Sequence, residues 1–73
     1  MKKMSESIRI RLNGQDREIG VGLSVTELIE SLELTPALIV VELNRNILDR
    51  ERYDDTRLGS DDVVELVHFV GGG

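Results

Sequence analysis

The first segment of the chain alternates between hydrophobic and polar residues, which predicts a β-hairpin. Over residues 8–12 isoleucine or leucine occupies every second position and arginine the positions between, the period of two expected of a strand with one buried face. Asn13-Gly14 follows, and this dipeptide strongly favours a two-residue hairpin turn. The chain is then expected to return as a second strand whose inward-facing residues are Ile19 and Val21.

A short amphipathic helix is predicted after the hairpin. Ser24 and Glu27 match the capping box, in which each side chain accepts a hydrogen bond from the backbone N–H of the other residue. The hydrophobic residues behind it recur at helical spacing on one face and are Val25, Leu28, Ile29 and Leu32. Because Pro36 disfavours helical backbone at the residue before it, the helix is expected to end near Glu33 or Leu34.

The second half of the chain contains three further hydrophobic runs, each of which predicts a strand. They lie at residues 37–43, at Ile47–Leu48 and at residues 63–70. The first of these runs is nearly continuous, which indicates a central strand that is covered at least partly on both faces. Between the last two strands, residues 49–58 are polar and irregular, and one helical turn is expected around Arg50–Tyr53.

This order of elements predicts an α+β fold of the β-grasp type, a mixed sheet of four to five strands packed on one helix. The last strand is expected to pair in parallel with the first, because that pairing buries both. With 73 residues the chain is one domain, residues 1–73, and a domain of this size is only marginally stable. Residues 1–7 are expected to be frayed.

Composition narrows the range of functions. The chain has 14 acidic against 9 basic residues and a formal net charge of −5, which opposes binding to phosphate backbones. It contains no cysteine, so it has no thiol nucleophile and no thiolate metal ligand. No apolar stretch approaches the length of a membrane span, and no signal-peptide core follows the lysines at the start. We therefore expect a cytoplasmic protein that binds neither nucleic acid nor membranes.

The last predicted strand has two different faces. A charged side chain such as that of Glu65 is rarely buried without a partner, so the face of the strand that carries Glu65 is expected to face solvent. Val67 and Phe69 alternate with Glu65 on that face. Val64 and Leu66 are then expected in the core. An exposed aliphatic and aromatic patch is typical of a docking surface, which makes Glu65, Val67 and Phe69 the candidate partner-binding residues. The alternative is that Phe69 folds over the edge of the core.

The sequence offers no catalytic apparatus of its own, so we do not expect an enzyme. His68 is the only histidine, and one histidine without cysteines cannot form a zinc site; a structural role is the expectation for it. The aspartates between residues 49 and 62 match no calcium-loop spacing and are interpreted as solvated loop charges. No metal site and no resident cofactor are expected.

The chain ends on Gly71-Gly72-Gly73, directly after the last strand. Glycine has no Cβ, so this flexible tail can enter a channel too narrow for side chains, and three extended residues carry the terminal carboxylate about 10 Å beyond the strand. Coupling a carboxylate to AMP gives a mixed anhydride that sulfur or nitrogen nucleophiles can open. With a persulfide the product is a C-terminal thiocarboxylate, and with a lysine amine it is an isopeptide.

The chain resembles the ThiS family of sulfur carriers in thiamine biosynthesis. The resemblance extends over the whole chain in length and element order, and it is carried by residues 42–53, 55–58 and above all the ending Val-Glu-Leu-Val-His-Phe-Val-Gly-Gly-Gly over residues 64–73. It implies a ubiquitin-like β-grasp fold. The chain departs from the family at Ser60-Asp61-Asp62, where the family usually has an Asp-Gly-Asp turn. An unchanged fold is expected, because Asp tolerates left-handed backbone better than most residues.

The resemblance also implies a function and its partners. A ThiF-type adenylating enzyme would activate Gly73 with ATP, sulfur derived from cysteine through a desulfurase would convert it to the thiocarboxylate, and thiazole synthase (ThiG) would take up that sulfur. Gly73 would carry the sulfur, and Gly71 and Gly72 would form the flexible approach to it. Three alternatives remain open: a small subunit of molybdopterin synthase, a ubiquitin-like protein modifier, and a structural interaction domain with an incidental tail.

Overall fold

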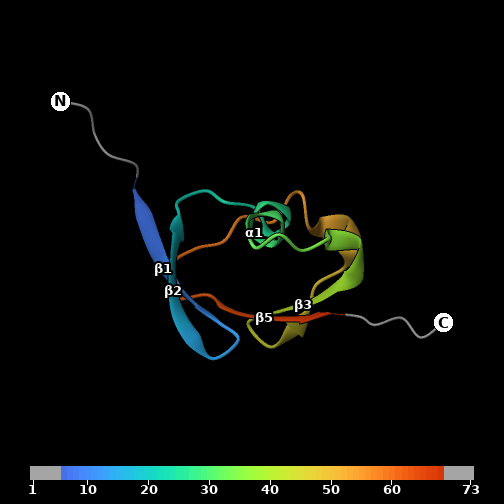
Figure 1. Cartoon of the computed structure of the whole chain (residues 1–73). Coiled ribbons are helices and arrows are strands. Elements are labelled where there is room, and N and C mark those ends of the chain that lie inside the picture. The colour runs from blue at the N-terminus through green and yellow to red at the C-terminus, as the bar shows by residue number, and fades with distance from the viewer. Residues whose placement is uncertain (1–5, 69–73) are drawn as a thin grey trace.

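The computed structural model describes residues 6–68. In chain order its elements are β1 Ser7–Leu12, β2 Gln15–Gly20, α1 Val25–Ser31, a 3₁₀ turn at Pro36–Leu38, β3 Ile39–Leu43, β4 Asn46–Ile47, a second 3₁₀ turn at Arg50–Arg52, and β5 Val63–His68. The strands form one sheet in the order β2-β1-β5-β3-β4, and α1 packs on one face of it (Figure 1). β1 and β5 are parallel and the other neighbours antiparallel. The predicted α+β, β-grasp arrangement is therefore confirmed.

The opening hairpin forms as predicted, although β2 is shorter at its end. Asn13 and Gly14 both have positive φ, 49° and 82°, as a two-residue turn of the type favoured by hairpins requires. Ile19 is buried, but the prediction that Val21 faces inward is wrong, because β2 ends at Gly20 and Val21 is 55% exposed. Of residues 1–7, for which fraying was predicted, Ser7 begins β1, and residues 1–5 lie outside the described residues.

Helix α1 begins at the predicted capping box and ends earlier than expected. The Glu27 N–H donates to Ser24 Oγ at 3.0 Å, and the Ser24 N–H donates to Glu27 Oε1 at 2.9 Å. After Ser31 the chain leaves the helix through Glu33, which adopts φ 63°. The N–H groups of Glu33 and Leu34 donate back to the last helical carbonyls, the hydrogen-bond pattern of a Schellman motif. The helix therefore ends by a backbone motif of its own, ahead of Pro36.

The hydrophobic core lies between α1 and the sheet. Its buried residues are Ile10, Leu12, Ile19, Val25, Leu28, Ile29, Ile39, Val41, Tyr53, Leu58 and Val64. The buried Tyr53 hydroxyl donates to the Ile39 carbonyl at 2.7 Å, which ties the segment after β4 to β3. No helix within residues 6–68 has the length and apolar character needed to cross a membrane.

Two strand boundaries in the second half differ from the sequence prediction. β3 begins at Ile39, two residues later than predicted, because Pro36–Leu38 forms a 3₁₀ turn. β4 is Asn46–Ile47, one residue earlier than predicted. The 3₁₀ turn at Arg50–Arg52 confirms the helical turn expected in that region. The turn before β5 contains Asp61 at φ 69°, the left-handed backbone that aspartate was expected to tolerate.

Candidate functional site

The alternation predicted for the last strand is present in β5. Val64 is fully buried and Leu66 is partly buried against the core. Glu65 is exposed, and Val63 and Val67 on the same side of the strand are 38% and 59% exposed. Two of the three predicted partner-binding residues, Glu65 and Val67, therefore lie together on the face of the sheet opposite α1. The third, Phe69, lies outside the described residues.

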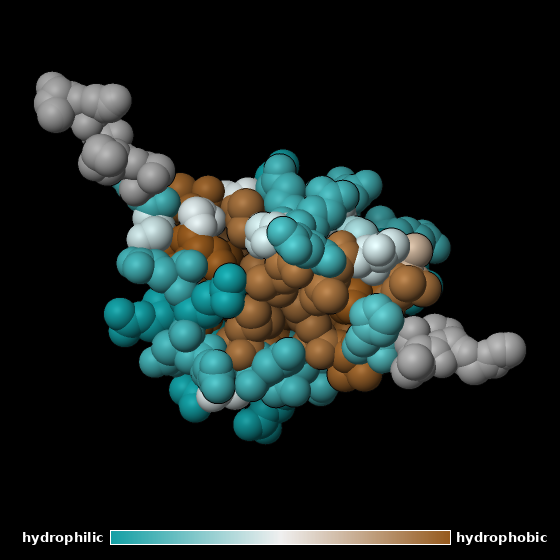
Figure 2. Space-filling view, viewed as in Figure 1, coloured by the Kyte–Doolittle hydropathy of each residue, from teal (hydrophilic) through white to brown (hydrophobic). Residues whose placement is uncertain are grey.

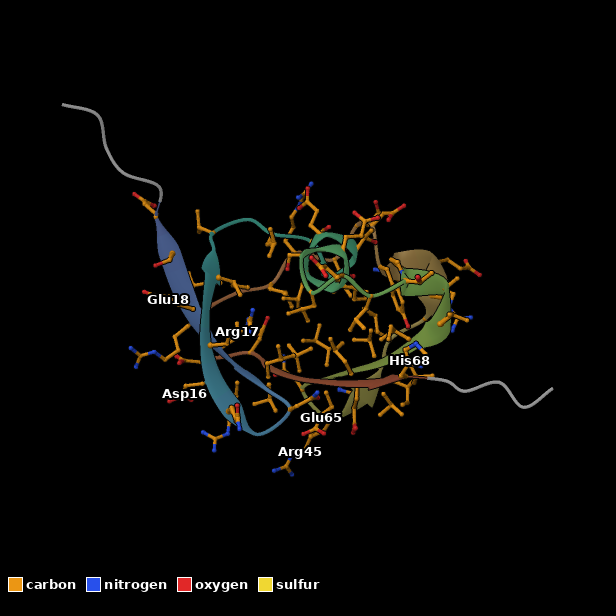
Figure 3. All side chains as sticks on the ribbon, viewed as in Figure 1. Asp16, Arg17, Glu18, Arg45, Glu65 and His68 are labelled. Atoms are coloured by element: carbon orange, nitrogen blue, oxygen red, sulfur yellow. The ribbon has the colours of Figure 1, made fainter. Side chains whose placement is uncertain are left out.

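Strand register adds residues of β3 and β4 to this outer face. Glu65 lies opposite Glu42 and Val67 opposite Val40 in the antiparallel β3–β5 pair, and Ile47 of β4 lies opposite Glu42. The outer face of the sheet therefore carries an apolar and acidic surface made of Val40, Glu42, Ile47, Val63, Glu65 and Val67. Glu42 and Glu65 line a shallow hollow on it together with Arg45 and Val63. In Figure 3, Glu65 and Arg45 lie on the side of β5 away from α1.

The contribution of β3 and β4 to this surface was not predicted from the sequence. The alternation of Val40 and Glu42 with the buried Ile39 and Val41 was visible in the sequence, but a nearly continuous apolar run does not show which face is exposed. Which residue of β3 lies beside Glu65 depends on the cross-strand register, and a shift of one residue would reverse the faces. The sequence therefore contained only the alternation of these residues, and the pairing with β5 was needed to show which of them lie on the outer face.

The two glutamates place like charges directly across the β3–β5 pair. Such pairs destabilise a sheet. Within residues 6–68, neither the Glu42 nor the Glu65 carboxylate makes a hydrogen bond or an ion pair. Arg45 is the one cation among the residues that line the hollow, and a partner that brought a further Lys or Arg there would add an attractive interaction with these carboxylates. The surface is thus suited to a partner that is apolar and basic.

The other residues considered in the sequence are His68, the loop aspartates and the C-terminal glycines. His68 is exposed at the end of β5 and lies opposite Ile39 on the side of the sheet that faces α1 (Figure 3). Among residues 6–68 no group of His, Asp and Glu is arranged to hold a metal ion. Gly71, Gly72 and Gly73, the predicted tail and sulfur-bearing residue, lie outside the described residues, and β5 is the last element before them.

Comparison with known proteins identifies relatives of the whole chain. The ThiS family model matches residues 10–73. The sulfur carrier protein ThiS of Bacillus subtilis is 38% identical over 68 residues, which span 88% of this chain and 98% of that protein. A thiazole synthase of Magnetococcus marinus is 35% identical over 66 residues, which span 90% of this chain but only 20% of that protein.

Solved structures agree with these matches. The crystal structure of the thiamine biosynthesis protein ThiS from Geobacter metallireducens superimposes with a TM-score of 0.77 at 36% identity, and the match covers 90% of this chain and 100% of that one. The likeness therefore includes the fold as well as the sequence, and it extends over nearly the full length of both chains. The chain belongs to the ThiS family of ubiquitin-like sulfur carriers.

Proposed function

We propose that this chain, a sulfur carrier of thiamine biosynthesis, holds its sulfur as a thiocarboxylate on Gly73 and delivers it to thiazole synthase. The observation that carries the proposal is the match of a 73-residue carrier with a Gly-Gly-Gly end to ThiS proteins over almost its whole length. The outer face of the sheet supports it, because that face offers a docking surface on the strand that leads into the glycine end.

The chemistry at Gly73 requires activation by another protein. A carboxylate is a poor acyl donor because oxide is a poor leaving group. A ThiF-type enzyme would transfer AMP from ATP to the carboxylate and release pyrophosphate. A persulfide sulfur would then displace AMP, and cleavage of the resulting acyl disulfide by a thiol would leave the thiocarboxylate. ATP is thus consumed by the partner, and the persulfide sulfur would originate from cysteine through a desulfurase.

A likeness to part of a thiazole synthase supports that enzyme as the partner. The thiazole synthase of Magnetococcus marinus contains a segment similar to this chain, amounting to about a fifth of that protein. A carrier-like segment within a thiazole synthase is what a functional association between carrier and enzyme would produce. We therefore place thiazole synthase at the receiving end of the transfer and the adenylating enzyme at its start, both in the cytoplasm.

Intact-mass spectrometry tests the proposal. The purified chain, incubated with the ThiF-type enzyme of the same organism, ATP and a persulfide donor, should gain about 16 Da at its C-terminus as oxygen is replaced by sulfur. Deletion of Gly73 should abolish this gain, because the carboxylate then ends about 3.5 Å short of its position in the full chain. The unfolding midpoint should not change, since Gly73 lies beyond β5. Thiocarboxylate formation by the shortened chain would contradict the proposal.

The alternatives predict different outcomes in the same host. Loss of the gene should cause thiamine auxotrophy, and a molybdenum cofactor defect with normal thiamine synthesis would instead indicate a molybdopterin synthase subunit. Adducts of the chain on lysines of other proteins would favour a protein modifier. The matched relatives named for ThiS and thiazole synthase favour the thiamine pathway.

A further inference from the structure

β5 is paired along its whole length on one side and only at its beginning on the other. β3 pairs with it over five residue pairs, from Leu43↔Val64 to Ile39↔His68. β1 pairs with it over two, Arg11↔Val63 and Leu12↔Val64. Because β1 ends at Leu12 and the chain turns back there into β2, residues 66–68 of β5 extend past the hairpin. We call residues 66–68 the open edge of β5.

The hydrogen bonds show which backbone groups the open edge exposes. The Asn44 N–H donates to the Val63 carbonyl at 2.7 Å, so in the alternating antiparallel pattern Val63, Glu65 and Val67 point their backbone groups toward β3. Those of Val64, Leu66 and His68 point to the opposite side. There the Val64 carbonyl accepts from the Asn13 N–H at 2.9 Å.

One side chain of the hairpin turn satisfies the next group along this edge. The Leu66 N–H donates to Asn13 Oδ1 at 2.8 Å. Beyond that point, the Leu66 carbonyl and the His68 N–H have no hydrogen-bond partner among residues 6–68. An acceptor and a donor, spaced as a strand requires, are therefore not used by any described residue on the side of β5 that β1 leaves uncovered.

The other two edges of the sheet are protected against pairing with a further strand, whereas no comparable protection of the open edge is found within residues 6–68. β4 is only two residues long, and β2 carries Asp16, Arg17 and Glu18 in succession. Short strands and charged edges are the usual means by which proteins prevent edge-to-edge association. The open edge has the sequence Leu-Val-His, without lysine, proline or a bulge. Its lack of protection suggests that pairing there is used.

We propose that the open edge of β5 binds an extended segment of the partner protein as an added strand. This inference rests on the proposed function and takes thiazole synthase as that partner. Backbone pairing would supply affinity, and the alternation of side chains would supply specificity, as in other cases of strand addition. It would also align the partner with β5, the described strand that comes before the glycines in the sequence.

The two faces of β5 define the chemistry of the added segment. Next to Leu66 it would place apolar side chains, because an apolar area is exposed between α1 and β5 (Figure 2). On the opposite face, beside Glu65, it would place Lys or Arg, because opposite charges on neighbouring strands attract and the Glu65 carboxylate has no ion pair within residues 6–68. The proposed occupant is therefore an extended segment in which apolar and basic residues alternate.

The test compares His68→Pro with His68→Ala for binding to purified thiazole synthase of the same organism. Both variants lose the imidazole, but only proline removes the N–H and fills the edge with its ring. Since this N–H is not used within residues 6–68, both variants should remain folded. We expect binding by His68→Ala to stay near that of the unmodified chain and binding by His68→Pro to weaken about tenfold or more, the loss of about one hydrogen bond plus a steric block.

Amide hydrogen exchange provides a second readout that needs no variant. In the free chain the Leu66 N–H should be protected by Asn13 and the His68 N–H should exchange rapidly. Addition of thiazole synthase should protect His68. Unchanged exchange at His68 in a complex that forms, or equal binding by both variants, would overturn the inference.

The remaining outcomes separate this inference from the proposed function. If the unmodified chain neither gains sulfur nor binds thiazole synthase, the proposed function fails, and this inference fails with it. If it does both while His68→Pro binds normally, only the open-edge inference fails. A concentration-dependent dimer of the chain alone, lost in His68→Pro by analytical ultracentrifugation, would assign the edge to a second copy and overturn the choice of partner.

Discussion

At the scale of single residues, several residues adopt left-handed backbone, and not all of these conformations were predicted from the sequence. Positive φ was expected at Asn13 and Gly14 in the hairpin turn and tolerable at Asp61, whereas the positive φ of Glu33, Asn44 and Arg45 was not predicted. Left-handed backbone is unfavourable for residues with a Cβ, and Asn and Asp tolerate it best. Glu33 is therefore a strained position, kept by the Schellman hydrogen bonds that end α1.

This strain leads to a stability prediction. Glu33→Gly should raise the free energy of unfolding by about 0.5–1 kcal/mol, because relief of the left-handed penalty exceeds the extra entropy of glycine in the unfolded chain. Urea denaturation measures the change. Glu30→Gly, an exposed position within α1, is the matched control and should lower stability by about 0.5–1 kcal/mol. Equal effects of the two substitutions would show that Glu33 is not strained.

At the scale of secondary-structure elements, β5 performs two tasks on its two faces. Toward α1 it contributes Val64 and Leu66 to the core, and on the outer face it aligns Glu65 and Val67 with Glu42 and Val40 of β3. The core face is favourable to folding, whereas the opposed glutamates are unfavourable to it. Stability and recognition should therefore respond to substitution at Glu65 in opposite directions.

Glu65→Lys tests that opposition. A lysine opposite Glu42 replaces a like-charge pair with an opposite-charge pair, so the free energy of unfolding should rise by about 0.2–1 kcal/mol. Binding to thiazole synthase should weaken, because the acidic surface loses the charge that matches a basic partner. Glu30→Lys makes the same change in net charge on the exposed side of α1 and should leave binding near its original value. Unfolding and binding titrations at equal ionic strength give both quantities.

At the scale of the whole molecule, stability depends on a small core that β5 completes. β5 lies in the middle of the sheet between β1 and β3, although it is the last strand within residues 6–68 (Figure 1). Val64 is fully buried there, next to Leu12 on β1 and Leu43 on β3. The free energy of unfolding of a domain of this size is only about 5 kcal/mol. Because β5 is central, substitutions on the face of β5 that points toward α1 should strongly affect stability.

Substitutions on the two faces of β5 should therefore differ sharply in their effect. Val64→Ala removes buried methyl groups and leaves a cavity, and it should lower the free energy of unfolding by about 1.5–3 kcal/mol. Val63→Ala, at a residue that is 38% exposed on the outer face, should lower it by less than about 0.5 kcal/mol. Thermal denaturation by circular dichroism measures both. Comparable losses would mean that the outer face is buried in a way the structure does not show.

The sequence by itself determined the elements that local interactions control. The Asn13-Gly14 turn, the capping box of Ser24 and Glu27, and the alternation that turns Glu65 and Val67 outward all depend on neighbouring residues, and all were predicted. The element order, the parallel pairing of the last strand with the first, and the family resemblance were also correct. They follow from the periodicities and from the distinctive ending of the chain.

Only the tertiary structure decided the features that depend on register between distant segments. Glu42 and Glu65 are 23 positions apart in the sequence, and Asn13 and Leu66 are 53 positions apart, so no local pattern specifies that either pair meets. The early end of β2 at Gly20 and the early end of α1 at Ser31 likewise result from backbone geometry that propensity does not encode. The acidic and apolar surface and the open edge of β5 exist because the sheet assembles in one register, and that register is set by burial of the core.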